Sequence, residues 1–159
     1  MSDEHALLRQ AVRLAIDNAA AGQLPFGALV VRAGEVLASG VNTALRDGDP
    51  TAHAEVVAVR AACRATGELF LTGATVVSSC EPCAVCHAVA ASAGVTRIVY
   101  AAPKEYVPDL GDPAPPAAAD VALRMQQALR ALAPDQVVHV PTDDAREPFT
   151  RFLAGRSRR

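Results

Sequence analysis

Two short motifs of metal-binding side chains, lying between Thr51 and Ala88, constrain this chain more than any other feature. The first motif is His53-Ala54-Glu55, and the second is Pro82-Cys83-Ala84-Val85-Cys86. Each motif opens an apolar run with helical character, at a point where a strand or loop is expected to give way to a helix. The chain is therefore expected to bring the starts of two helices to one edge of a sheet.

The residue types and their spacing predict a zinc site. Cys83 and Cys86 are three residues apart, so on a helix they share one face, with Cβ atoms about 5–6 Å apart. In a first helical turn, the unpaired N–H groups and the helix dipole favour thiolates, which are the metal-binding form of cysteine. His53 supplies a third ligand from the start of the preceding helix. Three protein ligands leave one tetrahedral position for water, which is the arrangement of catalytic zinc sites.

Glu55 is the predicted catalytic residue. It follows His53 by two residues, so it is poorly placed to be a fourth ligand from the same helical turn. It is well placed to reach a water molecule at the metal and to transfer its proton. The two motifs together predict a hydrolytic enzyme.

The cysteines could also belong to a redox motif, an iron–sulfur site or a structural zinc site. A C-x-x-C pair also occurs in redox motifs and structural zinc sites. Cys80, Cys83 and Cys86 resemble part of an iron–sulfur motif, but Cys63 lies far upstream and no Cys-Pro follows. Cys80 is better explained as a small buried residue that ends a strand. A structural zinc site needs a fourth ligand, either Cys80 or His87, and His87 points about 100° away from Cys86 on a helix.

Composition limits the class of protein. The chain has 159 residues, 51% of them hydrophobic, which fits one domain with a real core. Acidic residues outnumber basic ones by 17 to 15, so nonspecific binding of nucleic acid is not expected. No apolar run approaches the roughly 20 residues that span a membrane, and no export signal opens the chain. We therefore expect a cytoplasmic protein with reduced cysteines.

Hydrophobic periodicity predicts strands alternating with helices, and therefore a sheet with helices on both faces and some parallel pairing. A hairpin is expected at Ala33-Gly34. The predicted helices are residues 2–22, 53–66, 83–94, 121–132 and 148–154, and the predicted strands are residues 26–31, 35–39, 74–79, 95–101 and 136–140.

The whole chain, residues 1–159, is expected to form a single domain. Five prolines between Pro103 and Pro116 predict a loop that neither helix nor strand can occupy, and long loops of this kind are usually functional. Residues 156–159 form a basic tail that is expected to be solvated and mobile.

A His-x-Glu followed by Pro-Cys-x-x-Cys is the signature of zinc-dependent deaminases. From about His5 to Ala102 the chain resembles the cytidine and deoxycytidylate deaminase superfamily, and within it the small bacterial guanine deaminases. The resemblance is carried by Pro25–Ala28, Asn42, Asp49–Val56 and Ser79–Cys83 with Cys86.

The resemblance implies a three-layer α/β/α cytidine-deaminase-like fold with a central five-stranded mixed sheet. It implies a zinc cofactor bound by His53, Cys83 and Cys86, with Glu55 as the proton shuttle. It also implies substrate contacts from the Phe26 ring, the Asn42 amide and the Ala54 backbone N–H. A homodimer is implied, with a C-terminal segment that crosses to cover the partner's site.

Some positions depart from the guanine branch. Ala84-Val85 stands where Pro-Met is usual between the cysteines, and no aromatic residue follows Phe152 to close the site. The branch places an acidic residue after the last strand to bind the edge of guanine, and Asp109 and Asp112 are the candidates here.

The sequence therefore predicts a zinc-dependent hydrolase that acts on the exocyclic C–N bond of a free nucleobase. The product is a carbonyl, and ammonia is released. The expected substrate is guanine or a related aminopurine, aminopyrimidine or aminotriazine. The alternatives are a cytosine- or cytidine-type or nucleoside deaminase and, against the acidic balance of charge, a tRNA adenosine deaminase.

Overall fold

The computed structural model describes residues 2–111 and 114–158, which fold around a five-stranded sheet with strand order β2-β1-β3-β4-β5. The elements are α1 (Ser2–Ala20), β1 (Gly27–Arg32), β2 (Glu35–Val41), α2 (Ala44–Asp47), α3 (Ala54–Thr66), β3 (Ala74–Cys80), α4 (Ala84–Ser92), β4 (Arg97–Ala102), η1 (Lys104–Tyr106), α5 (Pro116–Leu132), β5 (Val137–His139) and α6 (Glu147–Arg156). Each predicted helix and strand is present, with ends that differ by a few residues.

The sheet is mixed. β1 pairs antiparallel with both β2 and β3, whereas β3, β4 and β5 run parallel to one another. The predicted hairpin is confirmed, because Ala33 and Gly34, with φ of 51° and 80°, join β1 to β2. Positive φ at both central residues is typical of the two-residue turns that suit a twisted hairpin. The carboxyl ends of β2, β3 and β4 consequently lie at one edge of the sheet.

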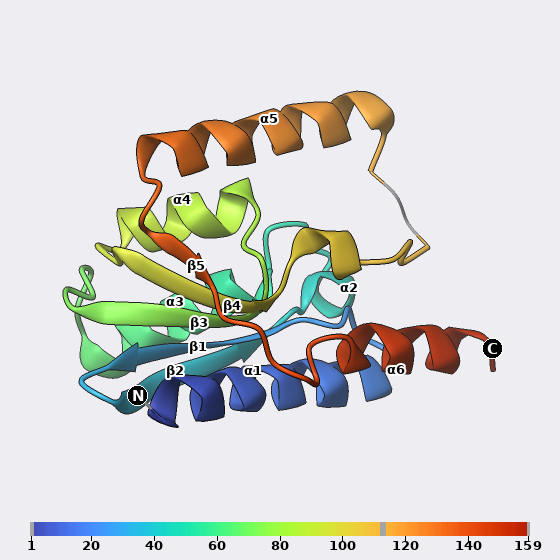
Figure 1. Ribbon diagram of the computed structural model, residues 1–159, viewed down its shortest axis with the longest axis horizontal. Coiled ribbons are helices and arrows are strands. Elements are labelled where there is room, and N and C mark those ends of the chain that lie inside the picture. Colours follow the sequence, from blue (N-terminus) through green and yellow to red (C-terminus); the bar gives the residue numbers. More distant parts are fainter. Residues whose placement is uncertain (1, 112–113, 159) are drawn as a thin grey trace.

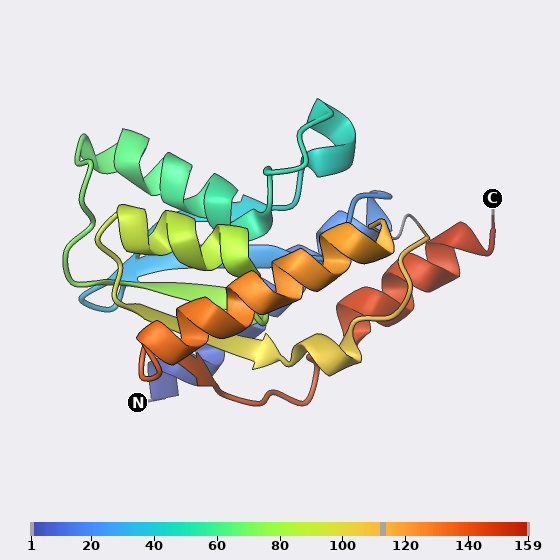
Figure 2. The same ribbon diagram turned by 90° about the horizontal axis from the view of Figure 1, so that it is seen from above.

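Helices cover both faces of the sheet, which confirms the predicted three-layer α/β/α architecture (Figure 1). α1 and α6 pack together on one face, and α3 and α4 lie on the other. α5 runs obliquely beside α4 on that second face (Figure 2). Because α6 packs here on α1 of its own chain, the predicted dimer with an exchanged C-terminal segment stays a prediction. Among the described residues, no helix is long and apolar enough to cross a membrane.

Two apolar clusters, one on each face of the sheet, hold the layers together. Successive strand side chains point to opposite faces, so Val76 joins the cluster under α3 and Val77 joins the one under α1. Leu8 and Val12 of α1 are fully buried in the second cluster. The helix layers are therefore attached to the sheet mainly by aliphatic packing. Burying each large apolar side chain stabilises the fold by roughly 1.5–3 kcal/mol.

The proline-rich segment 103–116 differs from its prediction. It contains one 3-10 turn, η1, directly after Pro103. The turn fits because Pro103 stands at its N-cap, where a missing N–H costs no helical hydrogen bond, and Pro108 lies beyond its end. α6 ends at Arg156, the first residue of the predicted basic tail, and the mobility of that tail stays a prediction.

α5 is confirmed as a helix, but its apolar stripe is not covered by the rest of the described chain. Val121, Met125 and Leu132 are 54%, 53% and 82% exposed, and no residue of α5 is buried. Helical periodicity in the sequence indicated the secondary structure correctly, and it carried no information about what the stripe contacts.

Gly40 sets the close approach of α3 to β2. A Cβ atom added at Gly40 would lie 2.5 Å from both the Ala54 carbonyl oxygen and the Ala58 backbone nitrogen. These are backbone atoms of the first turns of α3, so they cannot rotate away as a side chain could. Glycine at this position therefore fixes the height of the helix start above the sheet.

We expect Gly40→Ala to destabilise the fold by about 1–3 kcal/mol, because a methyl group forced against helix backbone overpacks the layer. Urea unfolding of the purified protein measures this loss. Gly155→Ala is the matched control, because nothing lies within 4 Å of the Cβ position there. Replacing a helical glycine by alanine stabilises by about 0.5–1 kcal/mol, so an equal loss in both variants would contradict the explanation.

Candidate metal centre and its cavity

The two sequence motifs meet where α3 and α4 begin. His53 is the N-cap residue of α3 and Cys83 the N-cap residue of α4, and neither side chain caps its own helix. Both cysteines were expected within the first turn, but Cys83 precedes it and only Cys86 lies inside the helix. The extended backbone of an N-cap residue turns the Cys83 side chain toward Cys86 and His53 instead of along the helix.

The three ligand atoms lie at the distances that zinc requires. His53 Nδ1 is 3.3 Å from Cys83 Sγ and 3.4 Å from Cys86 Sγ, and the two sulfurs are 3.5 Å apart. Tetrahedral zinc, with Zn–S near 2.3 Å and Zn–N near 2.0–2.1 Å, needs about 3.6 Å between nitrogen and sulfur and about 3.8 Å between sulfurs. The observed separations are each within about 0.3 Å of these values, so the donor set fits zinc.

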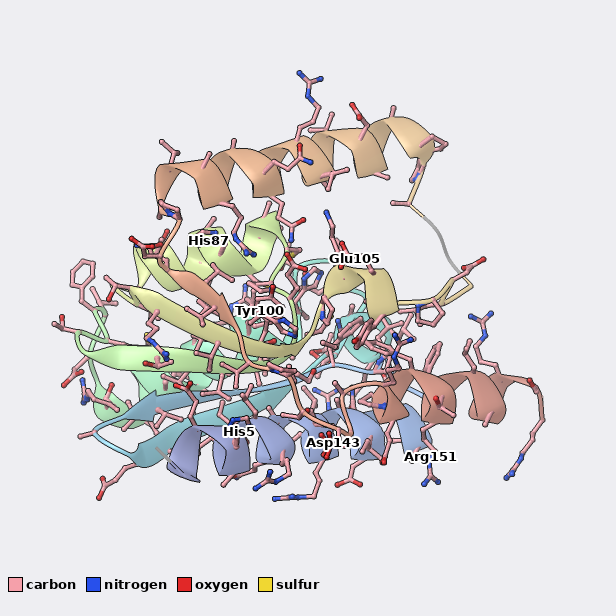
Figure 3. All side chains as sticks on the ribbon, in the orientation of Figure 1. His5, His87, Tyr100, Glu105, Asp143 and Arg151 are labelled. Carbon is pink, nitrogen blue, oxygen red and sulfur yellow. The ribbon has the colours of Figure 1, made fainter. Side chains whose placement is uncertain are left out.

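No fourth protein ligand completes this group among residues 2–111 and 114–158. Within that part of the chain, His53, Cys83 and Cys86 form the one group of three or more metal-binding side chains with ligand atoms within 4.8 Å of one another. Cys80 is buried at the end of β3, as expected. His87 lies on α4 below α5, where its Nε2 is 3.1 Å from Gln136 Oε1 (Figure 3). His87 is 3% exposed, so it is a buried residue outside the group of metal-binding side chains.

The contact between the two sulfurs shifts their pKa values in opposite directions. A hydrogen bond from the Cys86 thiol, with a further one from His53, lowers the pKa of Cys83 to about 4, although burial opposes the shift. The same contact with Cys83, together with burial, raises the pKa of Cys86 well above its usual value. The hydrogen bond to Cys83 raises the pKa of His53.

Glu55 is buried beside the ligands, with a 7% exposed side chain. The Ser78 hydroxyl donates to Glu55 Oε1 at 2.6 Å, and Cys86 Sγ lies 3.1 Å from Oε2. Burial raises the pKa of the Glu55 carboxyl, and the hydrogen bonds from Ser78 and Cys86 oppose the shift. The two oxygens of one carboxylate thus face a fixed hydroxyl on one side and the ligand set on the other.

A cavity of about 360 Å³ opens over the ligands and Glu55. Its volume falls within the range of small-molecule sites, roughly 300–1,000 Å³. Its walls come from the carboxyl edge of the sheet, the two helix starts, η1 and α5. The lining residues are Leu24, Phe26, Asn42, His53, Glu55, Cys80, Glu81, Cys83, Cys86, Lys104, Val107 and Gln126.

Two of the predicted substrate contacts line this cavity. Phe26 packs edge-on against Phe149 of α6, with ring centroids 6.0 Å apart, which supports its ring from behind. Asn42 is 4% exposed, and its Oδ1 accepts a hydrogen bond from the Ala44 backbone N–H. Its side-chain nitrogen has no partner among the described residues, so Asn42 offers a free donor to the cavity.

Two further predicted substrate contacts, Ala54 and Asp109, are not among the lining residues. Ala54 begins α3, so its backbone N–H has no partner within the helix. Asp109 lies outside the lining, and its Oδ1 accepts a hydrogen bond from the Gly111 N–H. Asp112 lies outside the described residues. The contacts of these three residues with a substrate stay predictions.

Three polar lining residues were missed by sequence reasoning. Both oxygens of Glu81 are occupied, one by Arg130 of α5 and the other by the Lys104 backbone N–H. Gln126 of α5 donates its Nε2 to the Pro82 carbonyl, which leaves Oε1 without a partner among the described residues. Lys104 follows the end of β4 and forms no ion pair with any described residue. Its place after a strand end was a usable signal, whereas nothing in the sequence connects α5 to this edge.

Comparison with known proteins matches residues 1–102 to the family described as the cytidine and deoxycytidylate deaminase zinc-binding region. Guanine deaminase of Bacillus subtilis is 40% identical over 101 residues, which are 63% of this chain and 65% of that protein. Its crystal structure superposes with a TM-score of 0.61 over 63% of this chain and 64% of the other.

Two further proteins are similar over different lengths. A structure of guanine deaminase from Nitrosomonas europaea is 25% identical, with a TM-score of 0.76, and the match covers 94% of this chain and 84% of the other. The tRNA-specific adenosine deaminase of Aquifex aeolicus is 32% identical over 51% of this chain and 54% of that protein. The chain thus spans less than two thirds of both curated relatives described here.

We expect the purified protein to carry about one zinc ion per chain, held by three protein ligands. His53→Ala, Cys83→Ser and Cys86→Ser should each lose it on dialysis against a chelator, as elemental analysis will measure. Cys63→Ser is the control, because that half-buried thiol lies on α3 outside the ligand group. Zinc retained by the three ligand variants, or lost from the Cys63 variant, would place the metal elsewhere.

Proposed function

Because the chain belongs to the cytidine and deoxycytidylate deaminase family that the zinc-binding region defines, we propose that it is a zinc-dependent hydrolytic deaminase of free nucleobases. The substrate is guanine or a related amino-heterocycle, and the reaction replaces the exocyclic amine by a carbonyl oxygen and releases ammonia. One observation carries this proposal. A buried carboxylate, that of Glu55, lines a cavity of about 360 Å³ beside a donor set that fits zinc and has three protein ligands.

His53, Cys83 and Cys86 are the residues that hold the metal. Zinc, when bound, acts as a Lewis acid that makes water a stronger acid and stabilises negative charge developing on oxygen. Glu55 accepts the proton of the attacking water and carries it to the ring nitrogen next to the reacting carbon. Glu55 then takes the second proton from the hydroxyl group now on that carbon and delivers it to the leaving amine. The C–N bond breaks, the C=O bond forms, and one water is consumed for each ammonia released.

The rest of the cavity binds and orients the base. Phe26 offers an aromatic face to the flat ring, and its own packing on Phe149 limits its movement. The free amide nitrogen of Asn42 donates to an acceptor on the ring, while Oδ1 is held by the Ala44 N–H. α5 contributes Gln126 to one side of the cavity.

Support for guanine comes from the relatives. The 40% identity with the Bacillus subtilis enzyme and the extended match to the Nitrosomonas europaea structure both favour the guanine branch. The charge of the cavity favours a wider search, because Lys104 lines it and both Glu81 oxygens are already bonded. A free cation suits a substrate edge rich in acceptors, so oxo-substituted pyrimidines and triazines belong among the candidates.

The second candidate function is deamination of adenosine in tRNA, which the 32% identity with the Aquifex aeolicus enzyme favours. Against it stands the net charge of −2 for the chain, because tRNA binding draws its affinity from contacts between cationic side chains and phosphates. Salt-dependent binding of tRNA, followed by inosine formation at physiological salt, would establish this alternative.

The direct test is an ammonia-release screen of purified, zinc-loaded protein. The panel holds guanine, adenine, cytosine, their nucleosides, aminopyrimidines, aminotriazines and a tRNA transcript. We expect release from at least one free base, and Glu55→Gln should keep zinc but lose turnover by about 10²–10⁴-fold, since the proton carrier is gone. An active Glu55→Gln protein would remove Glu55 from the proposed role, and an inactive wild-type protein across the panel would reject the proposed substrate class.

Asn42→Asp tests the orienting donor. The substitution keeps an oxygen for the Ala44 N–H and exchanges the free N–H₂ group for a second acceptor. We expect KM for the best base to rise at least about tenfold, since losing a net hydrogen bond and opposing an acceptor cost roughly 1–3 kcal/mol. Steady-state kinetics measure the change, with the midpoint of unfolding as the control for folding. An unchanged KM would remove Asn42 from the substrate site.

A further inference from the structure

Ser78 and Ser79 are neighbouring buried serines on β3, and their hydroxyls face opposite sides of the sheet. Ser78 is 1% exposed and Ser79 is 2% exposed. Ser78 Oγ lies 2.6 Å from Glu55 Oε1 on the α3 side. Ser79 Oγ accepts a hydrogen bond from the Gly27 N–H of β1, at 3.0 Å. The two residues therefore differ in one respect that matters here, because only Ser78 touches the buried carboxylate.

The backbone of β3 fixes the Ser78 hydroxyl in place. The Cys80 backbone N–H donates to the Ser78 oxygen at 3.3 Å. The Cys80 carbonyl oxygen, 2.7 Å away, is a second acceptor near the single hydroxyl proton that Glu55 Oε1 receives. Ser78 therefore sits on the rigid end of a central strand, whose hydrogen bonds to β1 and β4 leave it little freedom. A side chain that is hydrogen-bonded to this oxygen is therefore held in place by the sheet.

That contact decides which way the carboxylate faces. The terminal torsion of a glutamate is broad and roughly two-fold, so nothing intrinsic to Glu55 selects one orientation of the carboxylate plane. Ser78 holds Oε1, and Oε2 is then 3.1 Å from Cys86 Sγ on the side of the metal ligands. No other side chain among the described residues forms a hydrogen bond with Oε1.

We propose that Ser78 is a positioning residue for the deamination reaction, whose hydroxyl holds Glu55 Oε1 so that Oε2 is aimed at the metal ligands. This inference rests on the proposed function and adds a residue from outside both sequence motifs. Its contribution is one of alignment, since a displacement of about 1 Å in a reacting group can cost on the order of a hundredfold in rate.

Ser78→Ala should lower kcat by about ten- to a hundredfold while leaving KM within about twofold and zinc at its wild-type content, because alignment is lost and the cavity wall is not. Ser79→Ala is the matched control. It removes an equally buried hydroxyl from the same strand, so it should lower the midpoint of urea unfolding and leave kcat unchanged. An unchanged kcat in Ser78→Ala, or equal losses of kcat in both variants, would overturn the inference.

A second pair of variants covers the case in which Ser78→Ala does not fold. Threonine keeps the hydroxyl, and valine has nearly the same shape without it. Ser78→Thr should retain most of the turnover that Ser78→Val loses, and equal kcat values in the two would reduce the role of Ser78 to packing.

A double-variant cycle in urea unfolding tests the contact without any substrate. If the hydroxyl contacts Glu55, the double variant with Ser78→Ala and Glu55→Ala should lose less in its unfolding midpoint than the two single variants lose together. Strict additivity would mean that no such contact exists. This measurement does not depend on turnover, so it separates the two proposals. If Ser78 and Glu55 are coupled but the protein deaminates nothing, the proposed function is rejected. If the enzyme is active but the two residues are not coupled, only the positioning role is rejected.

Discussion

The convergence of two helix starts at one edge of the sheet is the constraint on which the rest of this structure depends. His53 and Cys83 occupy the N-cap positions of α3 and α4, and the ligand atoms meet only because both helices leave that edge over the same face. The height of α3 above β2 is set at Gly40, where backbone packs directly on backbone. A metal centre with ligand atoms 3.3–3.5 Å apart tolerates little drift, so the packing of the layers and the geometry of the ligands form a single requirement.

The buried ionisable groups of the site are stabilised by hydrogen bonds among themselves. An isolated carboxylate or thiolate is costly to remove from water unless hydrogen bonds or a counter-charge replace the lost solvation. Ser78 donates to Glu55 Oε1, and Cys86 Sγ lies 3.1 Å from Glu55 Oε2. Cys83 Sγ lies 3.3 Å from His53 Nδ1 and 3.5 Å from Cys86 Sγ. Every ionisable group at the centre is thus bonded to another member of the same group or to the end of β3. Under the proposed function, these contacts hold the Glu55 carboxylate next to the metal ligands before a base enters the cavity.

The sequence was most informative where a residue's role follows from its close neighbours in the chain. The spacing of His53, Glu55, Cys83 and Cys86 predicted the metal group, and alternating periodicities predicted the layers and the mixed sheet. It was least informative where the role depends on tertiary contact. Nothing around Gln126 indicates that α5 reaches Pro82, and the serine in β3 that holds Glu55 looks like any other buried strand residue. Proline content concealed η1, because one turn between prolines leaves no periodic signal.

The wall of the cavity is drawn from two different parts of the chain. The metal ligands, Glu55 and Asn42 all lie within residues 1–102, which match the family, whereas Lys104, Val107 and Gln126 come from the remainder. Under the proposed function, the metal ligands, Glu55 and two orienting residues therefore come from the first stretch, and one wall of the cavity comes from the second. The two stretches are joined by Gln126 at the Pro82 carbonyl and by Arg130 at Glu81. Substitutions in the downstream third thus reshape one wall of the cavity without replacing a metal ligand or Glu55.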